Sequence, residues 1–303
     1  MEKHKPVLLK EVLHFLDVGP GRRFIDSTAG GGGHTEAILE RKAKVLGIDQ
    51  DPAALEIVRK RLKVRLRTRP RRDKTRPNVF RVKLVQKNFT HLQEVASKEG
   101  FQKINGVLFD LGFASFQLDS GHGLSFSREE PLDMRLDPTL GVTASDLVNS
   151  LPEHELTKLF FEFGQEKQAR AIARNIVRTR SLKPVETTTE LASLVEEVYK
   201  RHPGNRIHPA TRVFMALRMA VNTELENLEQ ALPQAVEVLK KGGRLVVISF
   251  HSGEDRIVKE FMRKAEKEGL LKILTKKPVM PKEEEIEGNP RARSAKLRAA
   301  EKI

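Results

Sequence analysis

The sequence contains no cysteine among its 303 residues. This absence excludes disulfide bonds, zinc sites built from thiolates, and every mechanism that uses a cysteine nucleophile. The sequence also lacks an apolar run as long as a membrane span, and its first residues do not form a basic, apolar and small-residue signal sequence. We therefore expect a soluble cytoplasmic protein with no membrane partner and no metal site.

The charge of the chain is strongly positive, with a formal net charge of +14. A field of this sign attracts polyanions, and nucleic acid is the commonest polyanion of the cytoplasm. The alternative is that the basic side chains are simply solvated. With 39% apolar and 32% charged residues, the chain is long enough for one large domain with an insertion or for two unequal domains.

The first third of the chain alternates between strand-like and helix-like segments. Short apolar segments at 22–30, 43–51, 79–89 and 104–112 predict strands, and amphipathic segments stand between them. This alternation is typical of α/β proteins with a doubly wound parallel sheet. We therefore predict an α/β fold of that class.

The alternation stops near residue 115, and helical segments dominate as far as residue 208. We interpret 115–208 as a helical insertion between two parts of one sheet domain, 1–114 and 209–303. The last segments, 270–281 and 289–303, predict edge strands.

A basic run extends from Arg59 to Arg76 and has almost no apolar side chain after Leu66. Such a run cannot bury itself, so we predict a basic loop that touches phosphates. The alternative is a solvated surface loop without a specific partner.

Four consecutive glycines, Gly30 to Gly33, follow the first strand and precede His34. Their spacing fits the dinucleotide pattern G-x-G-x-x-G poorly. Asp49, at the end of the second strand, can accept hydrogen bonds from two ribose hydroxyls, and Asp110 ends the fourth strand at the same edge of the sheet. The set predicts a crevice for a nicotinamide dinucleotide or for S-adenosylmethionine. Either aspartate by itself could instead be a helix cap or a turn residue.

Longer motifs are more specific than the glycine loop. The segments "STAGGGGHT", "FDLGFASFQLD", "PLDMRLDP", "HPATRVFMALRMAVNTELENLEQAL" and "NPRARSAKLRAAE" together resemble the bacterial 16S ribosomal RNA cytosine-N4 methyltransferase family, also called the MraW family. The resemblance covers nearly the whole chain. It implies a class I S-adenosylmethionine-dependent methyltransferase fold with an inserted helical domain that recognises the substrate. The implied target is the exocyclic amine of a cytidine in 16S rRNA, near the decoding centre of the small ribosomal subunit.

The family's cofactor contacts can be carried over by position. The resemblance places them at Gly32, Gly33, His34, Asp49, Phe89, Asp110 and Gln117. We expect the bare backbone of the glycine loop to make room for the amino-acid end and the sulfur of the cofactor. The chain departs from the family at Phe113 to Phe116, where Val-Ser-Ser-Pro is usual, and at Gly253, where leucine is usual. The basic run before Arg76 is also longer than the family's connection.

The chemistry agrees with a nitrogen target. Methylation of cytosine at carbon 5 ordinarily needs a cysteine thiolate, which this chain does not have. An exocyclic amine needs no covalent step, so positioning supplies most of the acceleration, on the order of several kcal/mol. Asp110 is the candidate catalytic residue that orients the amine; the alternative is that it only binds the cofactor.

The substrate has to present an unstacked cytidine, as RNA does in irregular regions. Polar residues of the insertion and the tail are candidates to bind it, although each could instead form a structural ion pair. These candidates are Arg128, Asp133, Arg135, His208, Arg212, Arg291 and Arg293. The expected partner is 16S rRNA within the small ribosomal subunit, with no obligatory protein partner evident and the oligomeric state left open.

Three other functions have to be weighed. A nicotinamide-dependent oxidoreductase could use a similar sheet, although the glycine spacing disfavours it. A ribosome-assembly factor could keep the fold without catalysing methyl transfer, and the departure from the family's pattern at Phe113 to Phe116 is consistent with this alternative. A hydrolase built on Ser249, His251, Ser252 and Asp255 is disfavoured, because neighbours on one strand point to opposite faces and no nucleophile elbow is present.

Overall fold

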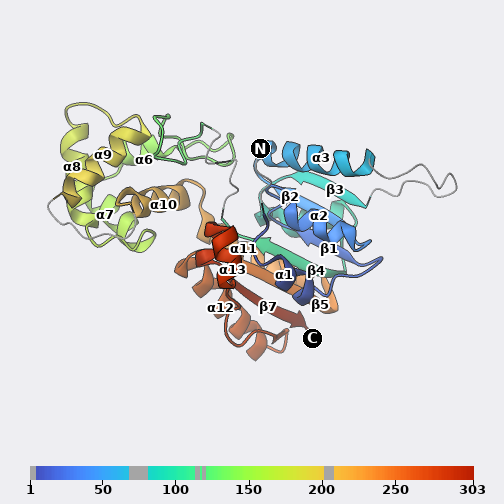
Figure 1. Cartoon of the computed structure of the whole chain (residues 1–303). Coiled ribbons are helices and arrows are strands. Elements are labelled where there is room, and N and C mark those ends of the chain that lie inside the picture. Colours follow the sequence, from blue (N-terminus) through green and yellow to red (C-terminus); the bar gives the residue numbers. More distant parts are fainter. Residues whose placement is uncertain (1–4, 68–80, 113–116, 118–120, 201–207) are drawn as a thin grey trace. The chain divides into compact units, whose positions relative to one another are not determined.

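The structure is a computed structural model that describes residues 5–67, 81–112, 117, 121–200 and 208–303. The chain forms two compact units (Figure 1). Unit 1 comprises Met1–Phe113 and Leu225–Ile303, and unit 2 comprises Ala114–Glu224. Phe113, Ala114, Ser115 and Phe116, and residues 68–76 of the basic run, lie outside the described residues. Residues 59–67 of that run belong to helix α3 (Pro52–Arg67), so the predicted basic loop is wrong for this half of the run.

Unit 1 is built on a sheet of seven strands in the order β3-β2-β1-β4-β5-β7-β6. The first five strands in the chain pair in parallel, and β7 pairs antiparallel with β5 and β6. The predicted doubly wound sheet is therefore confirmed, but only β6 of the two predicted edge strands lies at an edge, because β7 pairs with β5 on one side and with β6 on the other. The strands are β1 (Arg23–Asp26), β2 (Lys44–Asp49), β3 (Val82–Gln86), β4 (Ile104–Asp110), β5 (Leu239–Ser249), β6 (Leu271–Ile273) and β7 (Lys296–Lys302).

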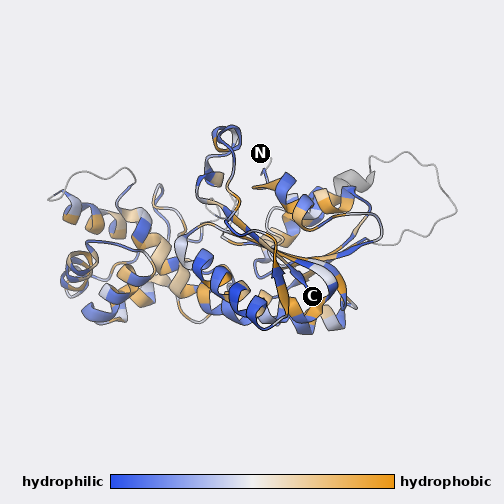
Figure 2. Cartoon of the chain, turned by 90° about the horizontal axis from the view of Figure 1, so that it is seen from below, coloured by the Kyte–Doolittle hydropathy of each residue, from blue (hydrophilic) through white to orange (hydrophobic). Residues whose placement is uncertain are grey.

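Helices cover both faces of this sheet, because the central strands are apolar on both sides. In β4, Val107 and Phe109 pack into one core with α4, α11 and α12, while Leu108 packs into the other with α1 and α2. Strands buried on both faces read as continuous apolar runs, and Figure 2 shows them largely in orange between two-coloured helices. The elements are α1 (Leu9–Phe15), α2 (Gly33–Glu40), α3 (Pro52–Arg67), η1 (Phe89–His91), α4 (Leu92–Lys98), α11 (Glu224–Val238), α12 (Ser252–Lys267), α13 (Glu283–Gly288) and η2 (Pro290–Ser294).

Unit 2 is helical around a core of its own, which includes Phe160, Ile176 and Leu217. Two of its helices begin with capping boxes, at Thr143 and at Thr187, each of which satisfies the free amides of a first turn. Its helices are α6 (Ala144–Ser150), α7 (Glu153–Glu162), α8 (Ala169–Arg180), α9 (Thr188–Tyr199) and α10 (Ala210–Val221).

The end of the insertion differs from the predicted boundary at residue 208. Helix α10 packs on α6, α7 and α9, so it belongs to unit 2, which ends at Glu224. The helical sequence pattern continues almost without a break from α10 into α11, so it does not indicate that the two helices belong to different units. In the part of the chain that the structure describes, no helix is long and apolar enough to cross a membrane.

Candidate functional site

The candidate site lies at the carboxyl ends of the parallel strands of unit 1. Strand β1 pairs with β2 on one side and with β4 on the other. The chain therefore reverses its direction across the sheet between β1 and β4, and such a switch point opens a crevice for ligands. The glycine loop follows β1, Asp49 ends β2, and Asp110 ends β4, as the sequence predicted.

The glycine loop is held by the protein's own packing. Gly32 has a φ of +76°, and a Cβ atom there would lie 3.2 Å from a methyl of Val58. A Cβ atom at Gly33 would lie 3.0 Å from the ring of Pro6. The expectation that bare backbone serves the ligand is therefore incomplete, because these two glycines first of all admit α3 and the N-terminal segment.

Asp49 joins the glycine loop to the second strand. Its carboxylate accepts hydrogen bonds from the backbone N–H of Gly30, at 2.7 Å, and of Asp51, at 2.9 Å. Withdrawal from water raises the pKa of Asp49 to about 7, against the lowering effect of these two bonds. A carboxylate has about four acceptor positions, so Asp49 keeps capacity for the two hydroxyls of a ribose.

Phe89 begins η1, directly after β3. Its ring packs edge-to-face on Phe109, with 5.6 Å between the ring centroids. Asn88 fixes the turn by accepting a hydrogen bond from the N–H of Thr90 and by donating one to the side chain of Gln50. Asn88, the residue before Phe89, is therefore bonded to Gln50, the residue that follows Asp49.

A buried network connects the ends of β1 and β4 to α2. The hydroxyl of Thr35 donates to Asp26 Oδ2 at 2.6 Å, and Nδ1 of His34 lies 3.3 Å from Asp110 Oδ2. The other ring nitrogen of His34 lies 3.0 Å from the carbonyl oxygen of Val7. Burial raises the pKa of Asp26. Three acidic or basic groups thus share one water-poor corner of the crevice.

Asp110 is fixed on both sides of its peptide. Its N–H donates to the hydroxyl of Thr28 at 2.7 Å, and the N–H of Leu111 donates to the carbonyl of Ile248 at 3.0 Å. The Oδ1 atom is buried and has no hydrogen-bond partner among the described residues. A buried acceptor without a partner is costly, so this atom is suited to receive a hydrogen bond from a ligand.

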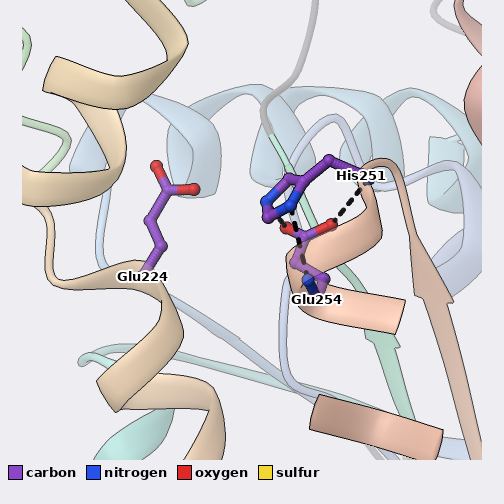
Figure 3. A group of neighbouring side chains, drawn as sticks. All are labelled: Glu224, His251 and Glu254. Atoms are coloured by element: carbon purple, nitrogen blue, oxygen red, sulfur yellow. Dashed lines mark hydrogen bonds and ion pairs between the residues drawn. The ribbon is translucent and has the colours of Figure 1, made fainter. Parts of the chain in front are cut away.

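The segment after β5 does not form a hydrolase site. His251 caps α12, because its Nδ1 accepts the N–H of Glu254 (Figure 3). The carboxylate of Glu254 accepts the N–H of Phe250. Asp255 is bound to Arg298 by hydrogen bonds of 2.7 and 3.1 Å instead of to a histidine. Glu224, also drawn in Figure 3, pairs with Arg218.

The predicted substrate residues of unit 2 are held within that unit. Both oxygens of Asp133 pair with Arg135 at 2.7 Å, which lowers the pKa of Asp133, and Arg135 also donates to the carbonyl of Leu140. His208 stacks on Phe126 at 4.3 Å between ring centroids. The pair of Asp133 and Arg135 organises its own loop, so an RNA contact would add to a structural function.

The remaining candidates differ in exposure. His208 also forms an ion pair with Glu196 at 3.0 Å. Arg128 is exposed, Arg212 is half-buried, and Gln117 is buried within unit 2 at 7% exposure. These exposures do not test the functions predicted for Arg128, Arg212 and Gln117.

Arg291 and Arg293 are exposed on η2, just before β7. Because β7 runs antiparallel to β5, its first residue, Lys296, pairs with Ser249 at the end of β5. The two arginines therefore stand at the same edge of the sheet as the glycine loop and Asp110. The structure thus brings the tail residues to the carboxyl edge of the parallel strands, which a linear motif cannot show.

Sequence reasoning missed a row of cations on α8. Arg170, Arg174 and Arg178 are exposed and follow one another at intervals of four residues, opposite the buried Ile172 and Ile176. Residues at this spacing lie on one face of a helix. We call these three residues the α8 arginine stripe. Their spacing is visible in the sequence, where the segment indicates only a helix.

Comparison with known proteins identifies the family. The model of the MraW methylase family matches residues 1–303. A curated relative from Carboxydothermus hydrogenoformans, named ribosomal RNA small subunit methyltransferase H, is 46% identical, with 99% of this chain and 98% of the relative covered. A relative of the same name from Thermomicrobium roseum is 48% identical, with 99% and 94% covered.

Among solved structures, an rRNA methylase from Streptococcus thermophilus is 12% identical, with a TM-score of 0.45 and with 97% of this chain and 95% of that chain covered. A score this low carries no argument about function. The family match and the close relatives confirm the predicted class I methyltransferase fold and S-adenosylmethionine as the cofactor. This chain therefore belongs to the MraW methylase family.

Proposed function

We propose that this methyltransferase transfers a methyl group to the N4 exocyclic amine of a cytidine in 16S rRNA, near the decoding centre of the small ribosomal subunit. The name of the relatives supports small-subunit rRNA as the substrate class, and the resemblance of the motifs supports the N4 position. The observation that carries the proposal is the buried, unpartnered Oδ1 of Asp110 at the switch point of the sheet.

The crevice fits S-adenosylmethionine, which supplies a methyl group on a sulfonium when it is bound. Asp49 offers its free acceptor positions to the ribose hydroxyls, and Phe89 flanks the nucleoside. We assign the remaining contacts to Gly32, Gly33 and His34 in the loop and to Gln117 of unit 2. The unit 1 residues are all set at the carboxyl edge of one sheet.

The chain's task in catalysis is to hold the amine. The lone pair of this amine is delocalised into the cytosine ring, so the amine reacts only when its orientation is fixed. Asp110 Oδ1 accepts an N–H of the amine and turns its nitrogen toward the methyl group, and the water-poor environment strengthens this hydrogen bond. In the alternative, Asp110 forms a hydrogen bond to the cofactor alone.

Asp110→Asn separates these two functions. The change keeps the size of the side chain and one acceptor atom. If Asp110 orients the amine, the variant binds S-adenosylmethionine with nearly unchanged affinity and loses methyl transfer. Loss of cofactor affinity in calorimetry would assign Asp110 to the cofactor instead.

RNA binding is assigned to the cations of both units. The net charge of +14 supplies attraction to phosphate, and the α8 arginine stripe and the exposed Arg291 and Arg293 supply local contacts. We also propose that the candidates Arg128, Asp133, Arg135, His208 and Arg212 face the RNA. Charge does not distinguish RNA from DNA, so the choice of rRNA depends on the relatives and the resemblance. The basic run from Arg59 to Arg76 and the cytoplasmic location stay predictions.

Methyl transfer from radiolabelled S-adenosylmethionine to small subunits that lack the modification tests the proposal directly. Nucleoside analysis should place the label on N4 of cytidine. Absence of label would favour a non-catalytic assembly factor, and label on another nucleoside would refute the N4 assignment. Calorimetry with S-adenosylmethionine and with NAD separates the oxidoreductase, since binding of NAD alone would overturn the methyltransferase proposal.

A further inference from the structure

The contacts of His34 restrict where its protons lie. Its side chain is 5% exposed, and its Nε2 lies 3.0 Å from the carbonyl oxygen of Val7. A carbonyl oxygen only accepts hydrogen bonds, so Nε2 has to carry a proton. Nδ1 lies 3.3 Å from Asp110 Oδ2. A neutral ring protonated on Nε2 would therefore turn the lone pair of Nδ1 toward a carboxylate oxygen.

A second proton between Nδ1 and Asp110 removes this repulsion, and the surroundings decide which partner holds it. Asp110 of β4 and Asp26 of β1 are the charged groups that face the ring, and both are acids. The N-terminal segment adds the partial negative charge of the Val7 carbonyl, and Thr35 of α2 bonds to Asp26. Asp110, Asp26 and the Val7 carbonyl each favour a positive ring.

The balance of burial and charge agrees with this geometry. Burial lowers the pKa of His34, but the hydrogen bond and charge of Asp110, followed by the charge of Asp26, outweigh it. The pKa is therefore raised above the ordinary value of 6.5. An acid near a histidine stabilises the imidazolium most strongly where water is excluded.

We propose that His34 is a positioning residue, kept as an imidazolium that is ion-paired to Asp110 and that holds the Asp110 carboxylate in one orientation. The proposal deepens the proposed function and in its catalytic consequence rests on it. Oδ2 of Asp110 is turned to the imidazolium, so the unpartnered Oδ1 is the atom left for a ligand N–H.

This arrangement assigns Asp110 to the orientation of the amine. As the N–C bond to the methyl group forms and the methyl group leaves its sulfur with the bonding electron pair staying on sulfur, the amine nitrogen gains a positive charge. One of its protons then departs to water, which restores a neutral amine. Because Oδ2 of Asp110 already faces the imidazolium, Oδ1 is the atom left to contact the amine. Asp110 therefore orients the amine, and water takes up its proton.

Nitrogen-15 NMR of the full chain with labelled histidine tests the protonation state without any cofactor or activity. His34, assigned from the resonance missing in His34→Gln, should carry protons on both nitrogens and lose the second only above pH 6.5. In Asp110→Asn the titration should move downward by about one pH unit or more. A wild-type ring that is neutral at about pH 6.5, or an unmoved titration in Asp110→Asn, would overturn the proposal.

Two further measurements keep the test independent of folding defects. Asp26→Asn removes the second acid while its amide oxygen can still accept the hydroxyl of Thr35, and it should move the His34 titration downward by a smaller amount. His91 is exposed and lies 3.2 Å from Glu94, and at a fixed pH its resonances should keep their wild-type positions in both variants. Displaced His91 resonances would indicate a general loss of structure and would count against the proposal.

Kinetics separate positioning from cofactor binding. His34→Gln should lower kcat for methyl transfer by about tenfold or more while the Kd for S-adenosylmethionine rises less than about threefold. Equal losses in both would assign His34 to the cofactor alone. If wild-type protein places no methyl group on N4 of cytidine, the proposed function fails, whereas the NMR result for the pair of His34 and Asp110 stands or falls by itself.

Discussion

The pKa of Asp49 makes cofactor affinity dependent on pH in the neutral range. Only the ionised carboxylate accepts hydrogen bonds from both ribose hydroxyls while it holds the N–H groups of Gly30 and Asp51. With the pKa raised to about 7 by burial, the ionised fraction rises from about one tenth at pH 6 to about nine tenths at pH 8. Affinity should therefore increase about tenfold over this range, which corresponds to about 1.4 kcal/mol.

Calorimetry with 5′-methylthioadenosine measures this effect, because the compound keeps the ribose and has no amino acid that titrates in the same range. In Asp49→Asn the affinity should be low and independent of pH. Asp51→Asn is the matched control: it removes a neighbouring charge that raises the pKa of Asp49, so the slope should persist with its midpoint at lower pH. Equal wild-type affinity at pH 6 and pH 8, or a slope that persists in Asp49→Asn, would refute the reasoning.

Three other predictions follow from the fold. Gly32→Ala should lower the free energy of unfolding by about 1–3 kcal/mol, because the new methyl group meets Val58. Gly21 has a φ of +74° and nothing within 4 Å of its Cβ position, so Gly21→Ala should cost only about 1 kcal/mol, for the left-handed backbone. Equal losses of the two variants in urea denaturation would show that packing at Gly32 contributes nothing. The Tm of the cofactor-free protein should fall as the pH rises from about 6 to 9, because groups with a raised pKa bind more protons in the folded state than in the unfolded state. The stabilisation from His34 is complete below pH 6.5 and is lost as the pH rises through its folded pKa, and the stability contributed by Asp26 and Asp49 decreases above pH 3.8. A Tm that rises with pH would contradict these three assignments. Replacing the α8 arginine stripe with glutamine should weaken RNA binding and reduce the slope of log K against log salt by about 2 units; the same loss from three exposed cations of α12 would show that only net charge matters.

The sequence predicted well which residues lie at the carboxyl edge of the parallel strands, because the signals for strand ends are local. A short apolar strand that ends in glycine or aspartate marks its own carboxyl end, and parallel pairing then brings these ends together. Gly32, Asp49 and Asp110 therefore lie where the pattern placed them. The motif resemblance contributed what local patterns could not, namely the methyl donor and the family.

What the sequence could not show depends on contacts between distant segments. Gly32 packs against Val58, and Gly33 packs against Pro6. No spacing rule in the sequence identifies a glycine that is needed because a distant segment packs against it. The same holds for His34, whose proton positions depend on the Val7 carbonyl and Asp110. The boundary near residue 208 was wrong for a related reason, because packing alone assigns α10 to unit 2.

The position of β7 in the sheet has a consequence for how unit 1 folds. This strand lies between β5 and β6, and it pairs with β5 from Arg244 to Ser249. Until β7 inserts, β5 exposes an unpaired edge, which is a template for association with other chains. Unit 2, by contrast, draws its helices from one continuous stretch of chain, and local contacts form faster than distant strand pairs. The helical unit should therefore be complete while the sheet is still open at β5, and that intermediate is the one most exposed to aggregation during refolding.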